Sequence, residues 1–460
     1  MKSKMFARFK EIYFSIPYPW RFSMAAWLGL RLFYALWSMV ILALFPLSVQ
    51  NFEYQDTPVI SIFNLETSQS HLYLRKIGTE LLIFRVLDKN TILDEQTGSH
   101  WLVSTGQSVS GSFTGQQLIR SDVSVEKIFP YLGVQPHPDS FLSIWQRFDT
   151  NWYLSIAAQG YGKIPGDEHF PPLYPFLISL VGFLIGDLFL AGLFISHLAS
   201  LLVIKLLYDL FHVWLPPVQA RRALFFFLIF PASYYLFAAY SEALYSLLVL
   251  LFFRLAQKRA WLWAGVFVCL AILTRLHGVV LLPVLLYAMY LDKPFLQKIS
   301  HWLGLFIGGM GGIFYIFLRY ISGSESVLPV TESEWYVRLA FPWETFVYAV
   351  RYLFAGQMTF IDIINFIVVI SLIALLLLGW KKIPTFPLLY VVLSVIIMTA
   401  RVVETQPFSA IVRYSLSLFP LFGLMSLYAQ RKFVERLLVI LFLLFTLYFS
   451  AQFWLWGWVA

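Results

Sequence analysis

Long apolar runs separated by short polar stretches set the pattern of this 460-residue chain. Clear examples are the runs Leu188–His212, Ile361–Trp380 and Leu437–Phe453, each with basic residues close to one end. An α-helix needs about 20 mostly apolar residues to cross the hydrocarbon core of a bilayer. Because runs of this order recur along the chain, the pattern predicts an all-α polytopic membrane protein with about eleven transmembrane helices.

Residues 48–140 break this pattern. They are rich in Ser, Thr, Gln and Asp, and they contain short patches with apolar and polar positions in alternation, such as LYLRKI and LLIFRVL. A period of two is typical of a half-buried strand, and the apolar patches argue against a disordered loop. We therefore expect a basic cytoplasmic N-terminus (1–22), a first transmembrane helix (23–47), a small extracytoplasmic insert (48–140), an external loop with juxtamembrane helices (141–187) and a transmembrane bundle (188–460).

The charged residues indicate the orientation of the chain. They make up 13% of the sequence, about half the share found in soluble domains, and the formal net charge is +8. Many positive charges fall in short loops between apolar runs, as the positive-inside rule expects, so we expect no nucleic-acid partner. The same rule puts Asp149 and Glu242 together on the outer side. The single cysteine, Cys269, excludes a disulfide framework.

Candidate chemistry is densest in residues 144–175. A helix that lies at the membrane surface, with Trp152 and Tyr153 at the level of the headgroups, would carry Asp149. A carboxylate among aromatic rings is suited to accept a hydroxyl proton, so Asp149 is our candidate for a general base. The alternatives are a helix cap or an ion pair with Arg147.

Basic residues on the expected outer side form a second candidate site. Arginine forks match phosphate oxygens in a bidentate way, and lysine adds a point charge. The residues concerned are Arg275, Arg401, Arg413 and Lys163. A basic cluster on this side opposes the positive-inside bias, so we expect an anion such as a lipid phosphate to occupy it. Ion pairing of Arg275 with Glu242, or of Arg401 with Glu404, remains the alternative.

Asp167, Glu168 and His169 form a third group. Adjacent residues rarely converge on one ion and no second cluster of this kind is evident, so we expect a solvated acidic turn, with no metal and no cofactor. The sequence contains no P-loop, no GxSxG and no HExxH motif. Nucleotide hydrolysis and hydrolysis by serine or zinc are therefore not expected.

Four blocks of sequence carry a family resemblance. They are RFDTNWYLSIAAQGY at 147–161, HFPPLYPFL at 169–177, YSEAL followed by AG, LTR and a glycine within 240–278, and RY followed by FP within 413–420. In order and spacing they resemble the PIG-V-type mannosyltransferases, which add the second mannose in GPI-anchor assembly, and their bacterial relatives. Phe148 stands where bacterial members more usually have Trp, and His169 where a second Phe is usual. The insert at 48–140 lies outside the family pattern.

The resemblance implies a GT-C type glycosyltransferase that takes a sugar from a polyprenyl phosphate on the outer or lumenal side. The resemblance alone suggests that this sugar is mannose. Asp149, in the external loop, would be the catalytic base and would deprotonate an acceptor hydroxyl that attacks the anomeric carbon with inversion. Arg275 and Arg413 would stabilise the phosphate, and Glu242 would bind sugar or acceptor hydroxyls. The expected substrate-binding residues are Arg147, Trp152, Tyr153, Asp167, Glu168, His169, Tyr174, Glu242, Arg275, His277, Arg413 and Tyr414.

The resemblance leaves the acceptor and the membrane open. The acceptor is a lipid, a glycan or a protein, and the membrane is the plasma membrane in a bacterium or the endoplasmic reticulum in a eukaryote. A polyprenyl-lipid flippase or transporter would share the charged outer pockets, but it would be expected to show internal repeats, and we find none. A lipid-modifying enzyme such as a polymer ligase or phosphatase, and a scaffold without turnover, are further alternatives.

Overall fold

The computed structural model divides the chain into two compact units. One comprises Met1–Leu32, Tyr161–Phe449 and Val459–Ala460, and we call it the membrane unit; the other comprises Phe33–Gly160 and Ser450–Trp458, and we call it the insert unit. The structure describes residues 17–54, 57–64, 69–121, 134, 137–292, 297–323, 331–332, 337–403, 406–457 and 459.

Short antiparallel strands build most of the insert unit. Three of them, β1 (Leu47–Tyr54), β2 (Thr57–Asn64) and β3 (Gln69–Leu74), pair in chain order. A second sheet contains, also in chain order, β6 (Phe84–Val86), β7 (Thr91–Asp94), β8 (His100–Leu102) and β9 (Ser108–Ser110), and β4 (Lys76–Ile77) pairs with β5 (Glu80–Leu81). The expected small insert with strand character is confirmed.

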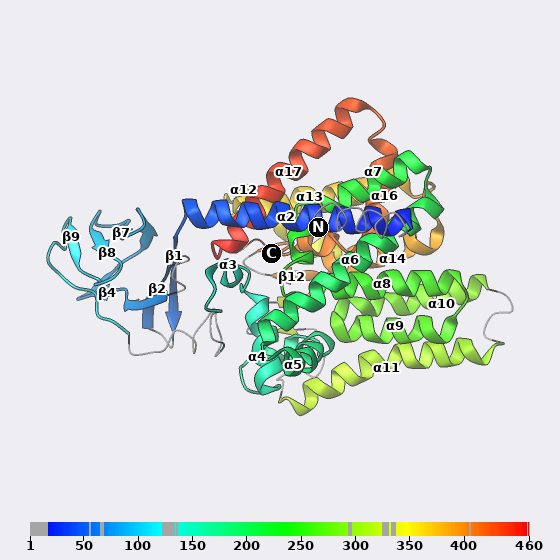
Figure 1. Cartoon of the computed structure of the whole chain (residues 1–460), viewed down its shortest axis with the longest axis horizontal. Coiled ribbons are helices and arrows are strands. Elements are labelled where there is room, and N and C mark those ends of the chain that lie inside the picture. The colour runs from blue at the N-terminus through cyan, green and yellow to red at the C-terminus, as the bar shows by residue number, and fades with distance from the viewer. Residues whose placement is uncertain are drawn as a thin grey trace, which may run out of the picture. The chain divides into compact units, whose positions relative to one another are not determined.

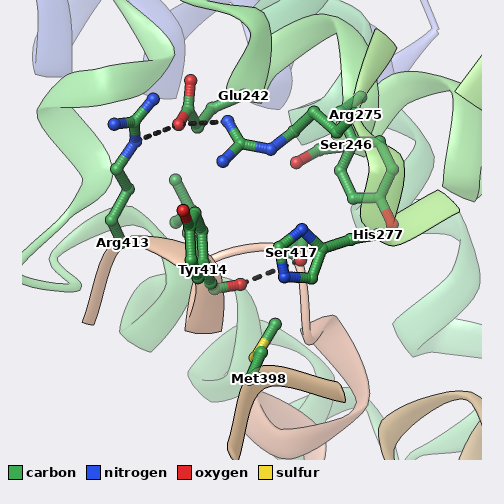
Figure 2. A pocket seen from close by; sticks show the side chains of 10 residues that line it. Glu242, Ser246, Arg275, His277, Met398, Arg413, Tyr414 and Ser417 are labelled. Carbon is green, nitrogen blue, oxygen red and sulfur yellow. Dashed lines mark hydrogen bonds and ion pairs between the residues drawn. The ribbon is translucent and has the colours of Figure 1, made fainter. Parts of the chain in front are cut away.

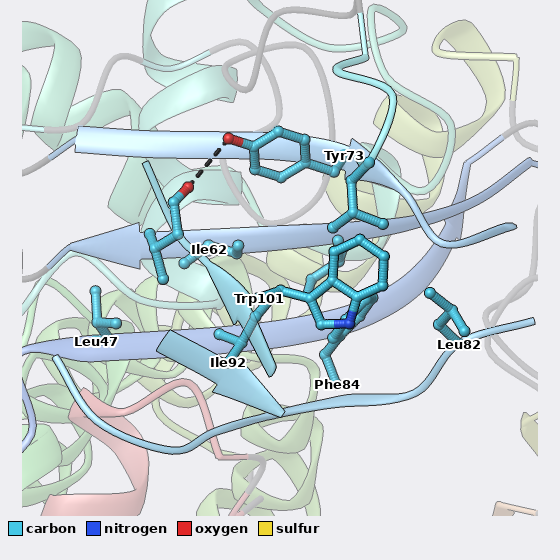
Figure 3. Close-up of a cluster of buried hydrophobic side chains, with 10 residues drawn as sticks. Leu47, Ile62, Tyr73, Leu82, Phe84, Ile92 and Trp101 are labelled. Carbon is cyan, nitrogen blue, oxygen red and sulfur yellow. Dashed lines mark hydrogen bonds between the residues drawn. The ribbon is translucent and has the colours of Figure 1, made fainter. Parts of the chain in front are cut away.

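An apolar cluster holds these strands together (Figure 3). Trp101 is fully buried in it, and its ring meets the ring of Phe84 edge-on with 6.1 Å between centroids. The hydroxyl of Tyr73 donates to the carbonyl oxygen of Val103 at 3.0 Å, so the polar end of this ring is satisfied inside the cluster. The insert unit therefore has a hydrophobic core of its own.

Two short helices follow the strands in the insert unit. The first, α3 (Ser140–Ser143), begins at Asp139, whose carboxylate accepts the N–H of Leu142. The second, α4 (Asp149–Gln159), ends at Gly160, where a φ of 79° requires a residue without a Cβ.

Five helices of the described chain are long and apolar enough to cross a membrane. They are α2 (Tyr18–Leu44), α6 (Leu188–Trp214), α11 (Ile299–Ile321), α13 (Phe360–Gly379) and α17 (Lys432–Trp454). Apolar helices too short to qualify accompany them, namely α5 (Leu173–Ile185), α9 (Trp261–Thr274), η4 with α10 (Leu276–Leu291), α14 (Thr385–Thr399) and α16 (Phe419–Tyr428). The protein is a mostly helical, multi-pass membrane protein, and the total of about eleven spans stays a prediction.

The other elements of the membrane unit connect these helices. The helical ones are η2 (Asp167–His169), α7 (Pro217–Leu228), η3 (Ser233–Leu236), α8 (Ser241–Gln257), α12 (Pro342–Phe354) and α15 (Ile411–Ser415). The stretch Leu276–Leu291 named above divides into η4 (Leu276–Val280) and α10 (Leu281–Leu291). A small antiparallel sheet contains β10 (Thr331–Glu332), β11 (Val337–Leu339) and β12 (Arg401–Val403). Proline stands in the first turn of α7 and of α12, where its missing N–H leaves no helical hydrogen bond unmade.

Helices α8, α9, α10 and α11 lie side by side in the membrane unit (Figure 1). Between α9 and α11 the backbones meet along Gly265, Gly304, Gly308 and Gly311, which we call the glycine seam. A Cβ added at Gly304 would lie 2.5 Å from the carbonyl oxygen of Trp261, and one added at Gly311 would lie 2.7 Å from that of Cys269. Small residues permit such close approach between membrane helices. The seam fixes α9, and with it the residue that follows its last turn, Arg275.

Candidate active site

Three segments far apart in the sequence bring charged side chains together in the membrane unit. Glu242 lies in the first turn of α8, Arg275 follows the last residue of α9, and Arg413 lies in the short helix α15. The free N–H groups and the dipole of a helix N-terminus favour a carboxylate such as that of Glu242. The fold thus places one anion at a helix start, between two cations that other elements deliver.

Glu242 is the acceptor for both arginines (Figure 2). Nη1 of Arg275 donates to Oε1 of Glu242 at 2.5 Å, and Nε of Arg413 donates to the same oxygen. Arg275 also donates to Oγ of Ser241 at 3.2 Å. The side chains of Glu242 and Arg413 are only 6% and 7% exposed. Removing one member of such a buried group would leave a charge uncompensated, so the three side chains hold one another in place.

Aromatic rings enclose the two guanidinium groups. The guanidinium carbon of Arg413 lies 4.9 Å from the ring centroid of Tyr235 and 4.7 Å from that of Tyr240. The guanidinium carbon of Arg275 lies 5.1 Å from the ring centroid of Tyr414. Guanidinium groups are attracted to ring faces at these distances, and the attraction grows when water is excluded. The rings therefore stabilise positive charge at this place without neutralising it.

A third arginine lies close to this cluster. Nη1 of Arg401, from β12, donates to the hydroxyl of Tyr414 at 3.2 Å, and the ring of Tyr414 lies 4.7 Å from the ring of His277. Among the described residues, Arg401 thus adds a third guanidinium group close to those of Arg275 and Arg413. The excess of positive charge makes this part of the membrane unit suited to an anion.

A cavity of about 280 Å³ opens beside these side chains. Figure 2 shows Glu242, Arg275, His277, Arg413 and Tyr414 around it. The lining is completed by Tyr245, Ser246, Met398, Leu416 and Ser417. Five of the residues expected from the sequence to bind substrate, namely Glu242, Arg275, His277, Arg413 and Tyr414, therefore meet at one place. The ion pair between Arg275 and Glu242, which the sequence left open, is present as well.

The backbone before Arg413 is strained. Phe408 and Ala410 have φ angles of 61° and 65°, in the left-handed region that residues with a Cβ seldom adopt. Such conformations persist where the surrounding structure over-determines them, and they cluster at functional sites. The strained turn positions Arg413 at the start of α15.

Asp167 organises the segment that follows Gly160. Its carboxylate accepts the backbone N–H groups of Gly162, Lys163 and Ile164 at 3.0 to 3.2 Å, and it is 2% exposed. The turn is therefore not a solvated one at this residue, because the glycine-rich stretch before it supplies N–H donors to a buried carboxylate. A substrate contact of Asp167 stays a prediction.

Glu168 and His169 lie next to a buried arginine. The carbonyl oxygen of Glu168 accepts from the hydroxyl of Tyr315 at 3.1 Å and from Nη1 of Arg319 at 3.4 Å. Burial, together with the positive charges of Arg319 and Arg401, lowers the pKa of His169 to about 4. The imidazole is thus neutral at pH 7, and its 3.4 Å approach to the carboxylate of Glu168 is then not an ion pair.

Asp149, the expected base, begins α4 in the insert unit and is half-buried. The residue before it, Phe148, has φ 45° and ψ −115°, an unusual conformation for a residue with a Cβ. The ring of Phe148 packs against Phe453 and Trp456, with 6.0 Å and 5.2 Å between centroids. This packing holds the backbone in the strained state, and strain beside a carboxylate at a helix start is consistent with a functional residue.

Four other expected residues are packed inside their units. Arg147 is 1% exposed, and it donates from Nε to the carbonyl oxygen of Trp454 at 2.9 Å and from Nη1 to that of Ser143 at 2.6 Å. The hydroxyl of Tyr174 donates to the carbonyl oxygen of Gly192 at 3.0 Å. Trp152 and Tyr153 are buried in α4. These contacts give each residue a structural role, and a substrate contact stays a prediction for all four.

Sequence reasoning missed several residues that the structure places beside the expected ones. Ser246 stands four residues after Glu242, which puts both on one face of α8, so helical spacing could have found it. Arg319 is a charge in the last turn of an otherwise apolar helix, a pattern that marks functional positions in membranes. Tyr240 carries no signal of its own among so many aromatic residues. Across the described residues, no three His, Cys, Asp or Glu side chains gather closely enough to hold a metal ion.

Comparison with known proteins adds one match. Residues 169–311 match the model of the dolichyl-phosphate-mannose-protein mannosyltransferase family. No curated protein and no solved structure matches the chain. The matched residues include Glu242 and Arg275 but neither Asp149 nor Arg413. Over residues 169–311 the chain is thus similar to the dolichyl-phosphate-mannose-protein mannosyltransferase family, and it is a membrane glycosyltransferase that depends on polyprenyl-phosphate mannose.

Proposed function

We propose that this enzyme transfers mannose from a polyprenyl phosphate to an acceptor hydroxyl on the extracytoplasmic or lumenal side, with inversion at the anomeric carbon. The observation that carries the proposal is the pair of arginines, the largely buried Arg275 and the buried Arg413, that share Glu242 at the edge of a cavity. Such a pair suits the phosphate of the donor. The negative charge that develops on the leaving phosphate rewards cations that are already in place.

The arginines are held before any substrate arrives. Glu242 fixes the direction of both guanidinium groups, and the aromatic rings fix their faces. Preorganised charges of this kind need little rearrangement during the reaction, which is where most of their catalytic value lies. Arg401 adds a further positive charge beyond Tyr414.

The proposal assigns the general base to Asp149. A base must be a carboxylate or imidazole that is fixed in orientation and able to take a proton from the acceptor hydroxyl. Asp149 is fixed by its place at the start of α4 and by the packed, strained residue before it. His169 is the alternative candidate for the general base, because its low pKa leaves the imidazole neutral and able to accept a proton at pH 7.

The subfamily and the acceptor belong to the proposal as well. The ordered blocks at 147–161, 169–177, 240–278 and 413–420 favour a relative of the PIG-V-type mannosyltransferases. We propose a lipid, glycan or protein acceptor for this reason, and either the bacterial plasma membrane or the endoplasmic reticulum as the location.

The test is sugar transfer by the purified protein in nanodiscs. Radiolabelled mannosyl- and glucosyl-phosphopolyprenol are supplied with a membrane lipid extract, and the wild type is compared with Asp149→Asn. A general base contributes roughly 10²- to 10⁴-fold, so we expect label in a new product to fall at least about 100-fold in the variant. Asp139→Asn is the matched control, because asparagine can also cap α3 at this exposed position.

Three outcomes separate the possible explanations. Transfer that survives Asp149→Asn at the wild-type rate would remove Asp149 as the base and direct attention to His169, Glu168 and Glu242. Consumption of neither donor by the wild type would contradict the proposed donor. Movement of labelled lipid across a proteoliposome bilayer without a new product would favour a flippase.

A further inference from the structure

Two residues that line the cavity each have a buried polar atom without a hydrogen bond in the described part of the chain. Glu242 and Ser246 lie one helical turn apart on the same face of α8, and the two residues are 5% and 6% exposed. Within the described part of the chain, Oε2 of Glu242 and Oγ of Ser246 make no hydrogen bond. Both residues line the cavity, as Figure 2 shows.

Ser246 differs in this respect from other buried helical serines of the membrane unit. Oγ of Ser426 donates to the carbonyl oxygen of Gly423 at 2.7 Å, and Oγ of Ser415 donates to that of Ile411 at 2.6 Å. A serine in a helix ordinarily satisfies its hydroxyl in this way, on a carbonyl of the preceding turn. Oγ of Ser61 and Oδ1 of Asp292 also make no hydrogen bond, but Glu242 and Ser246 line a cavity. A ligand in the cavity could supply the missing bonds of these two.

The chemistry of the two atoms defines that ligand. Oε1 of Glu242 is already taken by both arginines, so Oε2 is the oxygen left to accept a bond from an O–H or N–H donor. Oγ of Ser246 can both donate and accept. On one helix face the two side chains start about 5–6 Å apart, which matches separate hydroxyl groups on one small polyol.

The cavity limits the size of this polyol. The empty space of about 280 Å³ includes volume that is open to solvent, so the site excludes an oligosaccharide and accepts at most part of one sugar. Arg275 and Arg413 stand at the same cavity, so an anionic group belongs beside the hydroxyls. A hexose attached to a phosphate has both parts.

We infer that Oε2 of Glu242 and Oγ of Ser246 bind hydroxyl groups of the donor's sugar, and that Ser246 is a specificity-determining residue for that sugar. This inference rests on the proposed function, because the arginines must hold the donor's phosphate for its sugar to reach α8. It goes further by assigning the sugar to one face of one helix. A site that hydrogen-bonds a hydroxyl discriminates against an analogue that lacks it, because the polar group of the protein is then left unpaired.

The test compares two serine variants on a set of donors. Wild type, Ser246→Ala and Ser426→Ala are assayed in nanodiscs with mannosyl-phosphopolyprenol and with its 2-, 3-, 4- and 6-deoxy analogues. We expect Ser246→Ala to lower kcat/KM for the mannosyl donor about tenfold, and to change nothing for the one analogue that lacks the hydroxyl bound by Ser246. This non-additivity is the signature of a direct contact in a double-variant cycle.

The matched control separates contact from packing. Ser426 is equally a buried helical serine, but its hydroxyl is satisfied within α16, so Ser426→Ala should affect all donors by the same factor. The inference is overturned if Ser246→Ala likewise lowers every donor equally, or lowers none, as it would if only water occupied the cavity. A wild type that uses none of these donors overturns the proposed function and the inference together. A wild type that is active but shows no such pattern overturns the inference alone.

Discussion

Two buried carboxylates, at opposite ends of α9, invite comparison. Glu242 meets Arg275, which follows the last residue of this helix, whereas Asp292 accepts the indole N–H of Trp261, its first residue, at 2.8 Å. Each carboxylate attracts two cations. At Asp292 these are Lys298, with Nζ 2.9 Å from Oδ2, and Arg259, with Nη1 3.1 Å from Oδ1.

The two clusters differ in the exposure of their cations. Each oxygen of Asp292 has a cation within 3.1 Å, although Oδ1 makes no hydrogen bond within the described chain, whereas both cations of Glu242 bind one oxygen. The side chains of Lys298 and Arg259 are 43% and 68% exposed, so water screens them. Those of Arg275 and Arg413 are only 12% and 7% exposed, and they line a cavity. Cations that water screens serve the fold, whereas cations shielded from water beside a cavity are suited to a ligand.

The largest effect on kcat should come from Arg413, when one cation is replaced in each of the two carboxylate clusters. Arg413→Gln removes a cation placed for the developing charge on the phosphate, so we expect kcat to fall roughly 10²- to 10³-fold. Arg259→Gln removes an exposed cation from Asp292 and should leave kcat within about twofold. Initial rates of mannosyl transfer in nanodiscs check both. Equal losses would mean that the two clusters do not differ in function.

The next effect concerns the fold. Asp292→Asn keeps the shape of the side chain but removes the charge that Lys298 and Trp261 share, so we expect a loss of about 1–3 kcal/mol in the free energy of unfolding. The transfer rate per folded molecule should not change. Unfolding by detergent, followed by tryptophan fluorescence, gives the first quantity, and an active-site titration with labelled donor normalises the second. A large fall in the normalised rate would give Asp292 a part in catalysis.

The folding stability should depend on pH through His169. His169, close to Arg401, has a pKa of about 4, so between pH 6.5 and 4 the unfolded chain takes up a proton at this residue and the folded one does not. Folding stability should therefore fall as the pH falls through this window, by about 3 kcal/mol, and level off below pH 4. His169→Gln should show a shallower fall. Parallel curves for the two proteins would show that other groups carry the dependence.

The smallest effect should come from the exposed cation at the Asp292 end. Lys298→Gln removes an ion pair that water already screens, so we expect a loss of no more than about 1 kcal/mol in the free energy of unfolding. The loss should shrink further in high salt, because exposed charges are screened. A loss as large as that of Asp292→Asn would mean that Lys298, and not the set of partners, holds the carboxylate.

Sequence patterns predicted the local features of this fold, namely the strands of the insert unit and the long apolar helices. The patches LYLRKI and LLIFRVL predicted strands, and β3, β4 and β6 form there. Long apolar runs such as those of α6 and α13 predicted spans because their length matches a bilayer. Helices α9 and α14, with 14 and 15 residues, mark where such reasoning ends. Hydropathy does not distinguish a short span from a half-inserted helix.

Sequence reasoning predicted only the part of the candidate site whose residues lie close together in the chain. The pairing of Glu242 with Arg275 could be proposed because the two lie only 33 residues apart, on helices joined by a short turn. Arg413 lies 171 residues beyond Glu242, and only the packing of the whole membrane unit brings the two together. The burial of Asp167 depends on three backbone N–H groups, which residue types alone do not reveal.

The glycine seam between α9 and α11 has a consequence for how mutational data on this protein should be interpreted. Where two backbones touch, any side chain displaces a helix, so every substitution at Gly265 or Gly304 should be deleterious although neither residue has a group that could act on a substrate. In a saturation-mutagenesis screen for activity, these positions would be as intolerant as the arginines. A map of positions that tolerate no substitution would therefore include the seam and overestimate the extent of the active site. A parallel screen for protein abundance at the membrane would identify the seam positions, because their substitutions should lower abundance.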